Sequence, residues 1–400
     1  MRFFRDLEGS LDRGRIFTYC GILLAVEIGV FVLFIAGTHG LIVPLSGPTS
    51  TDFVSFYAAG TLADAGAPEL AYDQGSHYLA EQSATAPGIE YRFFYYPPVF
   101  LLLCAALARL PYLLAFLVFE AATLVFYLIV ARRILGERGW PVFIPLLAFP
   151  GVFWTMGLGQ NAFLTATLFG AATLCIDRRP VLAGVLFGAL CYKPHFGLLV
   201  PVALLAGRHW RASAAAFAAA AALCGLSLIL LGWETWRDFL AAATGSHATY
   251  ESGQITFGGL VSPFGAVLLL GGTRAAAYTV QTGATLAAGF LVAVVWRRGY
   301  ALPVRAAVLA AATLVAIPVV LVYDLMLATI AAAWLIRDAG RLPAWGGTAL
   351  AFLFVLSLDP RGMAEAWHIP IAPLVALGVV AIASVHAFRT DTASARYVTA

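Results

Sequence analysis

Long hydrophobic runs separated by short polar segments fill most of the chain between residues 16 and 388. They cover 16–38, 97–131, 140–157, 161–176, 180–192, 195–207, 210–231, 274–296, 303–336, 343–357 and 369–388. Several runs are shorter than the roughly 20 residues that a regular transmembrane helix needs. The run 303–336 is too long, because its residues would extend ~51 Å as one helix across a hydrocarbon core of ~30 Å. The pattern therefore predicts a bundle of membrane helices of unequal length.

Two polar breaks divide these runs. Lys193-Pro194-His195 separates the runs 180–192 and 195–207, and the long run bends near Pro318–Asp324. Short helices that meet at polar breaks imply a water-filled cavity at membrane depth. We also expect that 97–110, which ends at Arg109-Leu110-Pro111, does not fully span the bilayer.

Composition supports this interpretation. The 400 residues are 61% hydrophobic and 11% charged, with a mean hydropathy of +0.87, whereas soluble domains carry about 25% charged residues. A net charge of +3 is too small to define a protein that binds nucleic acid. We therefore predict an all-α polytopic membrane protein that forms a single integral-membrane domain and has membrane lipids as its surroundings.

Arginine placement orients the chain, because cytoplasmic loops are enriched in basic residues. Alternating the runs groups 18 of the 24 basic residues on one side, together with both chain termini. This predicts about 12 crossings, cytoplasmic tails at 1–15 and 389–400, an extracytoplasmic loop at 39–96 and a helical bundle at 97–388. The setting expected is a bacterial cytoplasmic membrane. The polar breaks then collect on the extracytoplasmic face, where we expect the chemistry.

The extracytoplasmic loop contains the first candidate catalytic residue, Asp52. Phe53, Phe56, Tyr57 and Gly60 recur at helical spacing, which predicts an amphipathic helix on the outer membrane surface. Asp52 lies in its first turn, where the helix dipole favours a carboxylate. Such a carboxylate can accept a proton from an attacking hydroxyl. The alternative is that Asp52 only caps the helix.

Two further segments carry candidate binding groups. Arg92 precedes a run of aromatic residues that includes Tyr95 and Tyr96. The arginine could pair with a phosphate, and the tyrosines could stack on a sugar or a prenyl chain. An aromatic belt at the membrane interface is the alternative. The amides of Gln160 and Asn161 can hydrogen-bond sugar hydroxyls, although a tight polar turn explains them equally well.

Lys193 is the one lysine of the chain, and a lysine between two short apolar helices usually faces a cavity and has a partner. A lipid-linked phosphate would suit it, with His195 adding a hydrogen bond. The alternatives are snorkelling and pairing with an acid. Tyr323-Asp324 supplies such an acid, which could instead bind sugar hydroxyls or a metal. Asp52 and Asp324 do not form a DxD pair and the histidines lack ligand spacing, so we predict neither a metal nor another cofactor.

With these residues in view, the sequence resembles glycosyltransferase family 87, the polyprenol-phosphate-mannose-dependent mannosyltransferases of the GT-C superfamily. The resemblance covers about 50–340. The matching elements are Asp52 to Gly60, Ala71-Tyr72-Asp73, Tyr96-Pro97-Pro98, Gly159-Gln160-Asn161, Arg179-Pro180 with Ala183-Gly184, Lys193-Pro194 and Tyr323-Asp324. The resemblance implies a GT-C-like bundle with an extracytoplasmic active site, a lipid-phosphate sugar donor, inversion at the anomeric carbon and Asp52 as general base.

The predicted function is transfer of a sugar, mannose by extrapolation, from a polyprenyl-phosphate donor to a lipid or glycan hydroxyl. Lys193, His195 and Arg92 would bind the donor phosphate. The sugar and the acceptor would contact Tyr57, Tyr95, Tyr96, Gln160, Asn161, Tyr323 and Asp324. A transporter or flippase, and a non-catalytic polyprenyl-phosphate-binding subunit, are the alternatives from other classes. Loss of turnover on replacing Asp52 separates them from a transferase.

Overall fold

The computed structural model describes residues 13–37, 43–44, 48–49, 51–245 and 256–398. The described chain is almost entirely helical, apart from a two-stranded antiparallel pair, β1 (Val43–Pro44) and β2 (Pro48–Thr49). Residues 1–12 of the predicted N-terminal tail lie outside the described part. Helix α20 (Ile371–Val398) continues into the predicted C-terminal tail, whose cytoplasmic location stays a prediction. An all-α membrane protein is thereby confirmed.

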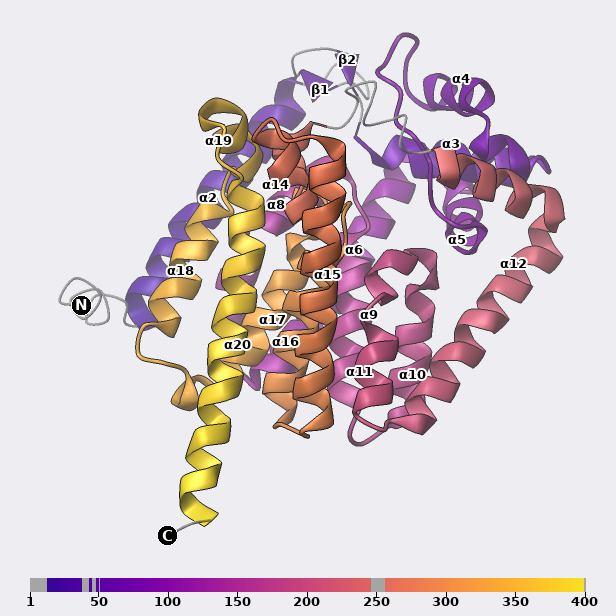
Figure 1. Ribbon diagram of the computed structural model, residues 1–400. Helices are drawn as coiled ribbons and strands as arrows, with labels where there is room; N and C mark the ends of the chain where they lie inside the picture. Colours follow the sequence, from indigo (N-terminus) through magenta and orange to yellow (C-terminus); the bar gives the residue numbers. More distant parts are fainter. Residues whose placement is uncertain (1–12, 38–42, 45–47, 50, 246–255, 399–400) are drawn as a thin grey trace.

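Helices of very different length run side by side through the bundle (Figure 1). The long ones besides α20 are α2 (Arg13–Gly37), α6 (Tyr112–Leu135), α12 (Trp210–Gly245) and α15 (Arg274–Arg297). The shorter ones are α5 (Pro98–Ala108), α9 (Ala162–Cys175), α10 (Pro180–Ala189), α11 (Val200–Ala206), α14 (Pro263–Leu269), α16 (Leu302–Ala316), α17 (Met326–Arg337), α18 (Gly346–Leu356) and α19 (Pro360–Trp367). Single 3-10 turns connect several of them: η1 (Pro68–Tyr72), η2 (Trp140–Val142), η3 (Leu190–Tyr192), η4 (Pro194–Gly197), η5 (Phe257–Gly259), η6 (Val322–Leu325) and η7 (Ala339–Arg341).

Among the described residues, five helices are long and apolar enough to cross a membrane by themselves. A sixth span is possible if α7 (Phe143–Leu147) and α8 (Pro150–Leu158) count as one span, although they are bent by 68°. The remaining apolar helices have 10–17 residues. The expected 12 crossings therefore stay a prediction, since they require these short helices to cross the bilayer in bent or broken pairs.

The breaks expected from the sequence occur where polar residues and prolines stand. α10 and α11 are separated by the turns on either side of Lys193. α16 ends at Ala316 because the residue before Pro318 is extended, as prolines require of their predecessors. α5 has 11 residues, about 16 Å of helix, and ends at Arg109 before Pro111. It is too short to span a bilayer, as the sequence predicted.

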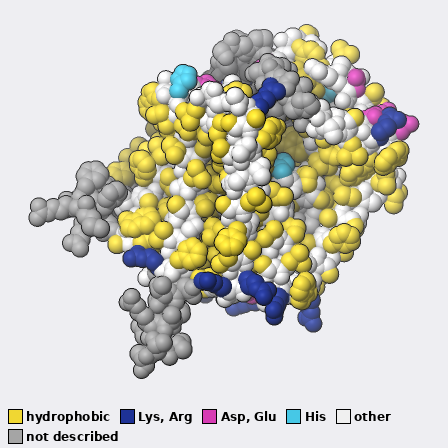
Figure 2. All heavy atoms as spheres, in the orientation of Figure 1, with side chains coloured by type: hydrophobic (Ala, Val, Ile, Leu, Met, Phe, Trp, Pro, Cys, Tyr) yellow, Lys and Arg dark blue, Asp and Glu magenta, His cyan; other side chains and the backbone are white. Residues whose placement is uncertain are grey.

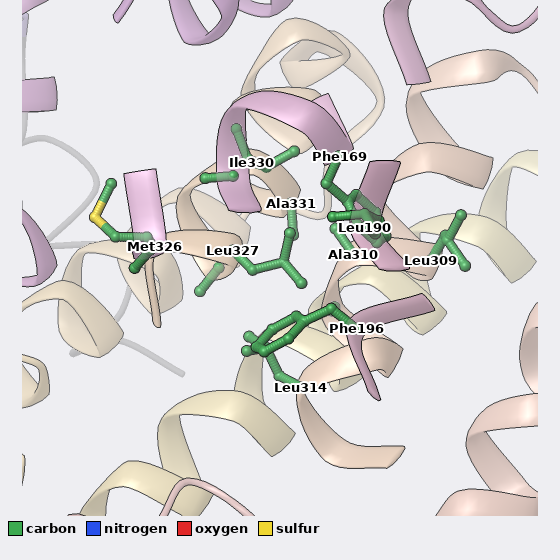
Figure 3. Close-up of a cluster of buried hydrophobic side chains, with 14 of the residues drawn as sticks. Phe169, Leu190, Phe196, Leu309, Ala310, Leu314, Met326, Leu327, Ile330 and Ala331 are labelled. Carbon is green, nitrogen blue, oxygen red and sulfur yellow. The ribbon is translucent and has the colours of Figure 1, made fainter. Parts of the chain in front are cut away.

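The core is centred on α16 and α17, which are buried along nearly their whole length. A helix that is apolar on all sides must be surrounded by protein or lipid. Figure 3 shows Ala310 and Leu314 of α16 in one cluster with Leu327 and Ala331 of α17. Phe169 of α9 and Phe196 of η4 fill the same cluster, so the core reaches the loop that carries Lys193.

Close helix contact explains the alanine-rich start of α12. A Cβ on Gly184 would lie 2.3 Å from the Ala212 carbonyl oxygen, and one on Gly188 would lie 2.4 Å from that of Ala216. Small residues four apart allow α10 and α12 to approach at backbone distance, as in membrane helix pairs generally. α12 bends at Gly232, whose φ of 82° is left-handed. Beyond this bend the helix continues to Gly245.

The surface-helix prediction for residues 53–60 is wrong in one respect. The segment does form helix α3 (Phe53–Asp64), but the helix is buried on nearly all sides over its first two turns. It packs against α5, α6 and α4 (Gln74–Ala84), and a Cβ on Gly60 would lie only 2.2 Å from the Cys104 carbonyl oxygen. α3 is therefore a structural wall of the site and not an amphipathic helix lying on lipid.

The two ends of the bundle differ in charge. Lysine and arginine side chains gather along the lower end in Figure 2, where the last turns of α6, α15 and α17 contribute Arg132, Arg133, Arg297 and Arg337. Helices α3 and α4 and the second half of α12 lie at the other end (Figure 1). Asp52 precedes α3, so the predicted base lies at the end opposite to the arginine-rich one.

Candidate active site

Asp52 is held by two side chains from distant parts of the sequence. Gln160 Nε2 donates a hydrogen bond of 2.9 Å to Asp52 Oδ2, and Arg92 Nε lies 3.4 Å from Oδ1. Asp52 stands at the N-cap position of α3 but makes no side-chain capping hydrogen bond. Its side chain is 21% exposed, so a ligand can reach the carboxylate. The capping alternative is therefore excluded, and the geometry leaves Asp52 available as a proton acceptor.

The turn at Gly159 brings Gln160 to Asp52. Gly159 ends α8 with a left-handed φ of 69°, and a Cβ there would lie 2.7 Å from Phe53 Cβ. The Asp52 backbone N–H donates to the Leu158 carbonyl at 2.7 Å, which fastens the start of α3 to this turn. Glycine is needed because other residues disfavour this backbone region and lack the space. The turn thus fixes the backbone position of Asp52, the predicted base.

A buried acid, Glu81 of α4, holds Arg92 in place. The Arg92 backbone N–H lies 3.1 and 3.2 Å from the two Glu81 carboxylate oxygens, and the Arg92 side chain turns toward Asp52. Glu81 is 0% exposed, and its burial raises its pKa to about 8. His77, one helical turn earlier, donates a hydrogen bond from Nε2 to the Ser55 carbonyl at 3.0 Å, and burial lowers its pKa to about 4. Both groups are therefore mainly uncharged near pH 7.

Lys193 lies in a second polar cluster, where it pairs with an acid. Its Nζ donates to Asp324 Oδ1 at 2.6 Å and to Asn161 Oδ1 at 3.2 Å. The Lys193 and Asp324 side chains are 4% and 3% exposed. Aromatic rings of Phe196 and Tyr323 lie 4.9 and 5.3 Å from the ammonium nitrogen. The structure thus matches the alternative in which Lys193 pairs with an acid. Binding of a phosphate by Lys193 stays a prediction, because it requires either that this pair opens or that the remaining N–H reaches the phosphate.

Consecutive amides connect the two clusters. Gln160 binds Asp52, while Asn161 accepts the hydrogen bond from Lys193. Tyr96 lies next to Gln160, since its hydroxyl donates to Gln160 Oε1 at 3.5 Å. The two amides therefore bind protein groups in this structure. They connect Asp52 to the buried Lys193–Asp324 pair through two neighbouring residues, an arrangement that neither sequence interpretation had specified.

The other expected residues divide between the site and its frame. The Tyr57 hydroxyl donates to the Leu110 carbonyl at 2.9 Å and so fastens α3 to the end of α5. Tyr95 is partly exposed beside Phe93, with ring centroids 5.1 Å apart. His195 has an exposed side chain next to the buried Lys193. Tyr95 and His195 thus remain accessible to a ligand, whereas Tyr57 has a structural partner.

Sequence reasoning missed Glu81 and His77. Their spacing of four residues places them on one face of a predicted helix, and this was the available signal. Their partners could not be anticipated, because Ser55 and Arg92 are 22 and 11 residues away. No group of three or more potential metal ligands occurs among the described residues.

The fold and this polar cluster define a polytopic membrane protein with an accessible carboxylate at one end of its helical bundle. The family model of glycosyltransferase family 87 matches residues 94–322, and the chain belongs to this family. It is therefore a membrane glycosyltransferase, as the sequence resemblance implied. Gln160 and Lys193 lie within the matched range, whereas Asp52, Glu81 and Arg92 precede it. The match ends at the first residue of η6, so Asp324 lies beyond it. No curated protein and no solved structure matched the chain.

Proposed function

We propose that this glycosyltransferase moves a sugar, mannose in the first instance, from a polyprenyl-phosphate donor to a hydroxyl of a lipid or glycan acceptor. The arginine-rich end would face the cytoplasm, following the tendency of basic residues to stay on that side. The Asp52 cluster would then face outward, and a lipid-linked donor is the donor class that the sequence resemblance implies for that side.

One observation carries this proposal: the Asp52 carboxylate is accessible, is not used as a helix cap, and is oriented by Gln160 and Arg92. A general base must be held within hydrogen-bond reach of the proton that it accepts. Gln160 fixes one carboxylate oxygen and leaves the other, Oδ1, beside the Arg92 guanidinium. A cation at this position also suits the phosphate of the donor.

In the proposed reaction the acceptor hydroxyl gives its proton to Asp52 while its oxygen attacks C1 of the sugar. The C1–O bond to the phosphate breaks on the opposite face, so the configuration at C1 inverts. The polyprenyl phosphate leaves with the electron pair of that bond. Arg92, and His195 where it reaches the phosphate, would stabilise the charge that develops on the leaving group. A phosphate leaves readily, so one carboxylate and a cationic pocket suffice.

A transfer assay tests the proposal. Purified full-length protein in detergent is given radiolabelled polyprenyl-phosphate mannose and a lipid and glycan extract from its host. We expect label to leave the donor only when the extract is present, and not with Asp52→Asn. The assay is repeated with polyprenyl-phosphate glucose and arabinose to identify the sugar. Failure of all three donors to react would contradict the proposed donor class, while normal turnover by Asp52→Asn would contradict the base.

A further inference from the structure

A cavity lies at the arginine-rich end of the bundle, far from Asp52. Its volume is about 330 Å³, and it is lined by the loop that joins α11 to α12, the last turn of α15 and the start of α16. Three arginines, Arg208, Arg297 and Arg305, contribute to its wall, together with Trp296. The glycosyl transfer proposed above uses none of these residues.

The cavity carries an excess of positive charge. Arg305 is neutralised by Asp177, whose two carboxylate oxygens each lie 2.9 Å from Arg305 Nη2. Burial, followed by the nearby Arg305 charge, lowers the pKa of His209, which lies 3.0 Å from Arg305 Nη1. Arg208 and Arg297 are exposed and have no carboxylate partner in the described part of the chain. Two positive charges therefore remain uncompensated at this cavity.

The wall of the cavity is held rigidly. The Arg305 residue is 8% exposed, its guanidinium lies 5.2 Å from the centre of the Trp296 ring, and the Trp296 indole N–H donates to the Arg305 carbonyl at 3.1 Å. Arg305 Nε is buried and has no hydrogen-bond partner within the described residues. Arg208 has a left-handed φ of 57°, which is unfavourable for a residue with a side chain. Strain of this kind persists where the surroundings fix the conformation, often at binding sites.

The arginine side chains in the cavity wall indicate which class of ligand it binds. Arginine binds phosphate oxygens through paired N–H donors and does so better than lysine at a fixed site. Basic pockets between membrane helices on the cytoplasmic side suit anionic lipid head groups, and the lipid ligand rests on the orientation proposed above, in which the arginine-rich end faces the cytoplasm. We propose that Arg208, Arg297 and Arg305 form a phosphate-binding site at the arginine-rich end, separate from the catalytic site, that takes the phosphate of an anionic lipid head group or a free phosphate.

Thermal unfolding of the full-length protein in a neutral detergent tests the proposal. The probes are dioctanoyl phosphatidylglycerol, dioctanoyl phosphatidylcholine and inorganic phosphate, each titrated against the Tm. The test variant is R208Q/R297Q, which removes two exposed charges and leaves the buried Arg305–Asp177 pair intact. The matched control is R133Q, which removes an exposed arginine at the same end of the bundle but outside the cavity.

We expect phosphatidylglycerol to raise the Tm saturably in the wild type and in R133Q, with an apparent Kd at least tenfold weaker in R208Q/R297Q. If inorganic phosphate produces the same arginine-dependent rise in Tm, the phosphate-binding site is supported and its ligand is free phosphate and not a lipid head group. Equal Kd values in all three proteins, or an equal shift with phosphatidylcholine, would overturn the proposal. Should the double variant fail to fold, R208Q and R297Q are titrated singly, and at least a threefold weaker Kd is expected from each.

Discussion

Removing Lys193 should destabilise the protein far more than removing an exposed arginine that also pairs with an acid. Lys193 Nζ and Asp324 Oδ1 are 2.6 Å apart, and both side chains are almost completely buried. At an effective dielectric constant of ~20, two unit charges at that distance attract by ~6 kcal/mol. The desolvation of each ion costs several kcal/mol, so the net contribution of the intact pair is small. Breaking the pair is different, because it leaves one charge buried and unpaired.

We therefore expect Lys193→Met to lower the free energy of unfolding by about 3–5 kcal/mol. The double variant K193M/D324L removes both charges and should recover most of that loss. The control is Arg109→Met, which breaks an exposed pair with Asp64 of 2.9 Å and should cost less than about 1 kcal/mol. The measurement is reversible unfolding in mixed detergent micelles, followed by tryptophan fluorescence.

The double variant also separates structure from chemistry. If Lys193 serves only its pair with Asp324, K193M/D324L should recover stability and transfer activity together. If Lys193 also stabilises the departing phosphate, stability should return while turnover stays low. Equal losses for Lys193→Met and Arg109→Met would refute the reasoning, because they would mean that the buried pair is no more costly to break than an exposed one.

Three other outcomes follow from the structure. Gly60→Leu should lower the free energy of unfolding by about 1–3 kcal/mol, because the leucine side chain would collide with the Cys104 backbone. Gly21→Ala is the control in the same unfolding measurement and should be neutral or slightly stabilising, because the space around Gly21 is open. Glu81 has a raised pKa of about 8 in the folded protein, so the folded state binds more protons and stability falls as pH rises from about 4.5 to 8. A plot of Tm against pH should lose this slope in Glu81→Gln. The control Glu90→Gln should keep the slope, because the Glu90 side chain is 63% exposed. An unchanged slope in Glu81→Gln would contradict the assignment of the raised pKa to Glu81. Turnover should be unaffected by EDTA, and a loss restored by added divalent cation would show that a metal takes part.

Local features of the sequence predicted much of the fold. The breaks at Lys193 and near Pro318, and the short helix that ends before Pro111, depend on proline and charge within a few residues. These features act through the backbone next to them, so no knowledge of the tertiary structure is needed. The same reasoning identified Asp52 and Lys193 as unusual.

Tertiary contacts account for what the sequence could not predict. The spacing of Phe53 and Phe56 indicated one apolar face on α3, but Ala58, Ala59 and Gly60 on the other side are buried too. Small residues give no hydrophobic signal, and only the approach of α5 explains them. The partner of Lys193 was likewise undetermined, because Asp324 is 131 residues away and a phosphate was an equally good partner for an ammonium group.

The roles of the site residues depended on the same long-range contacts. Gln160 and Asn161 are suitable for sugar hydroxyls by chemistry, yet each is used by a protein side chain, 108 and 32 residues distant. Glu81 was overlooked because its effect on Arg92 passes through the Arg92 backbone N–H. Short-range sequence patterns cannot reveal that contact.

The most direct test of the central claim is the turnover number of Asp52→Asn beside that of Asp64→Asn, with donor binding measured for both. Asp52 precedes α3 and Asp64 is its last residue, where it is exposed and paired with Arg109. Loss of a general base lowers the rate by about 10²–10⁴. We predict that loss for Asp52→Asn with donor binding retained, and nearly normal turnover for Asp64→Asn. Equal turnover in the two variants would contradict the assignment of Asp52 as the base.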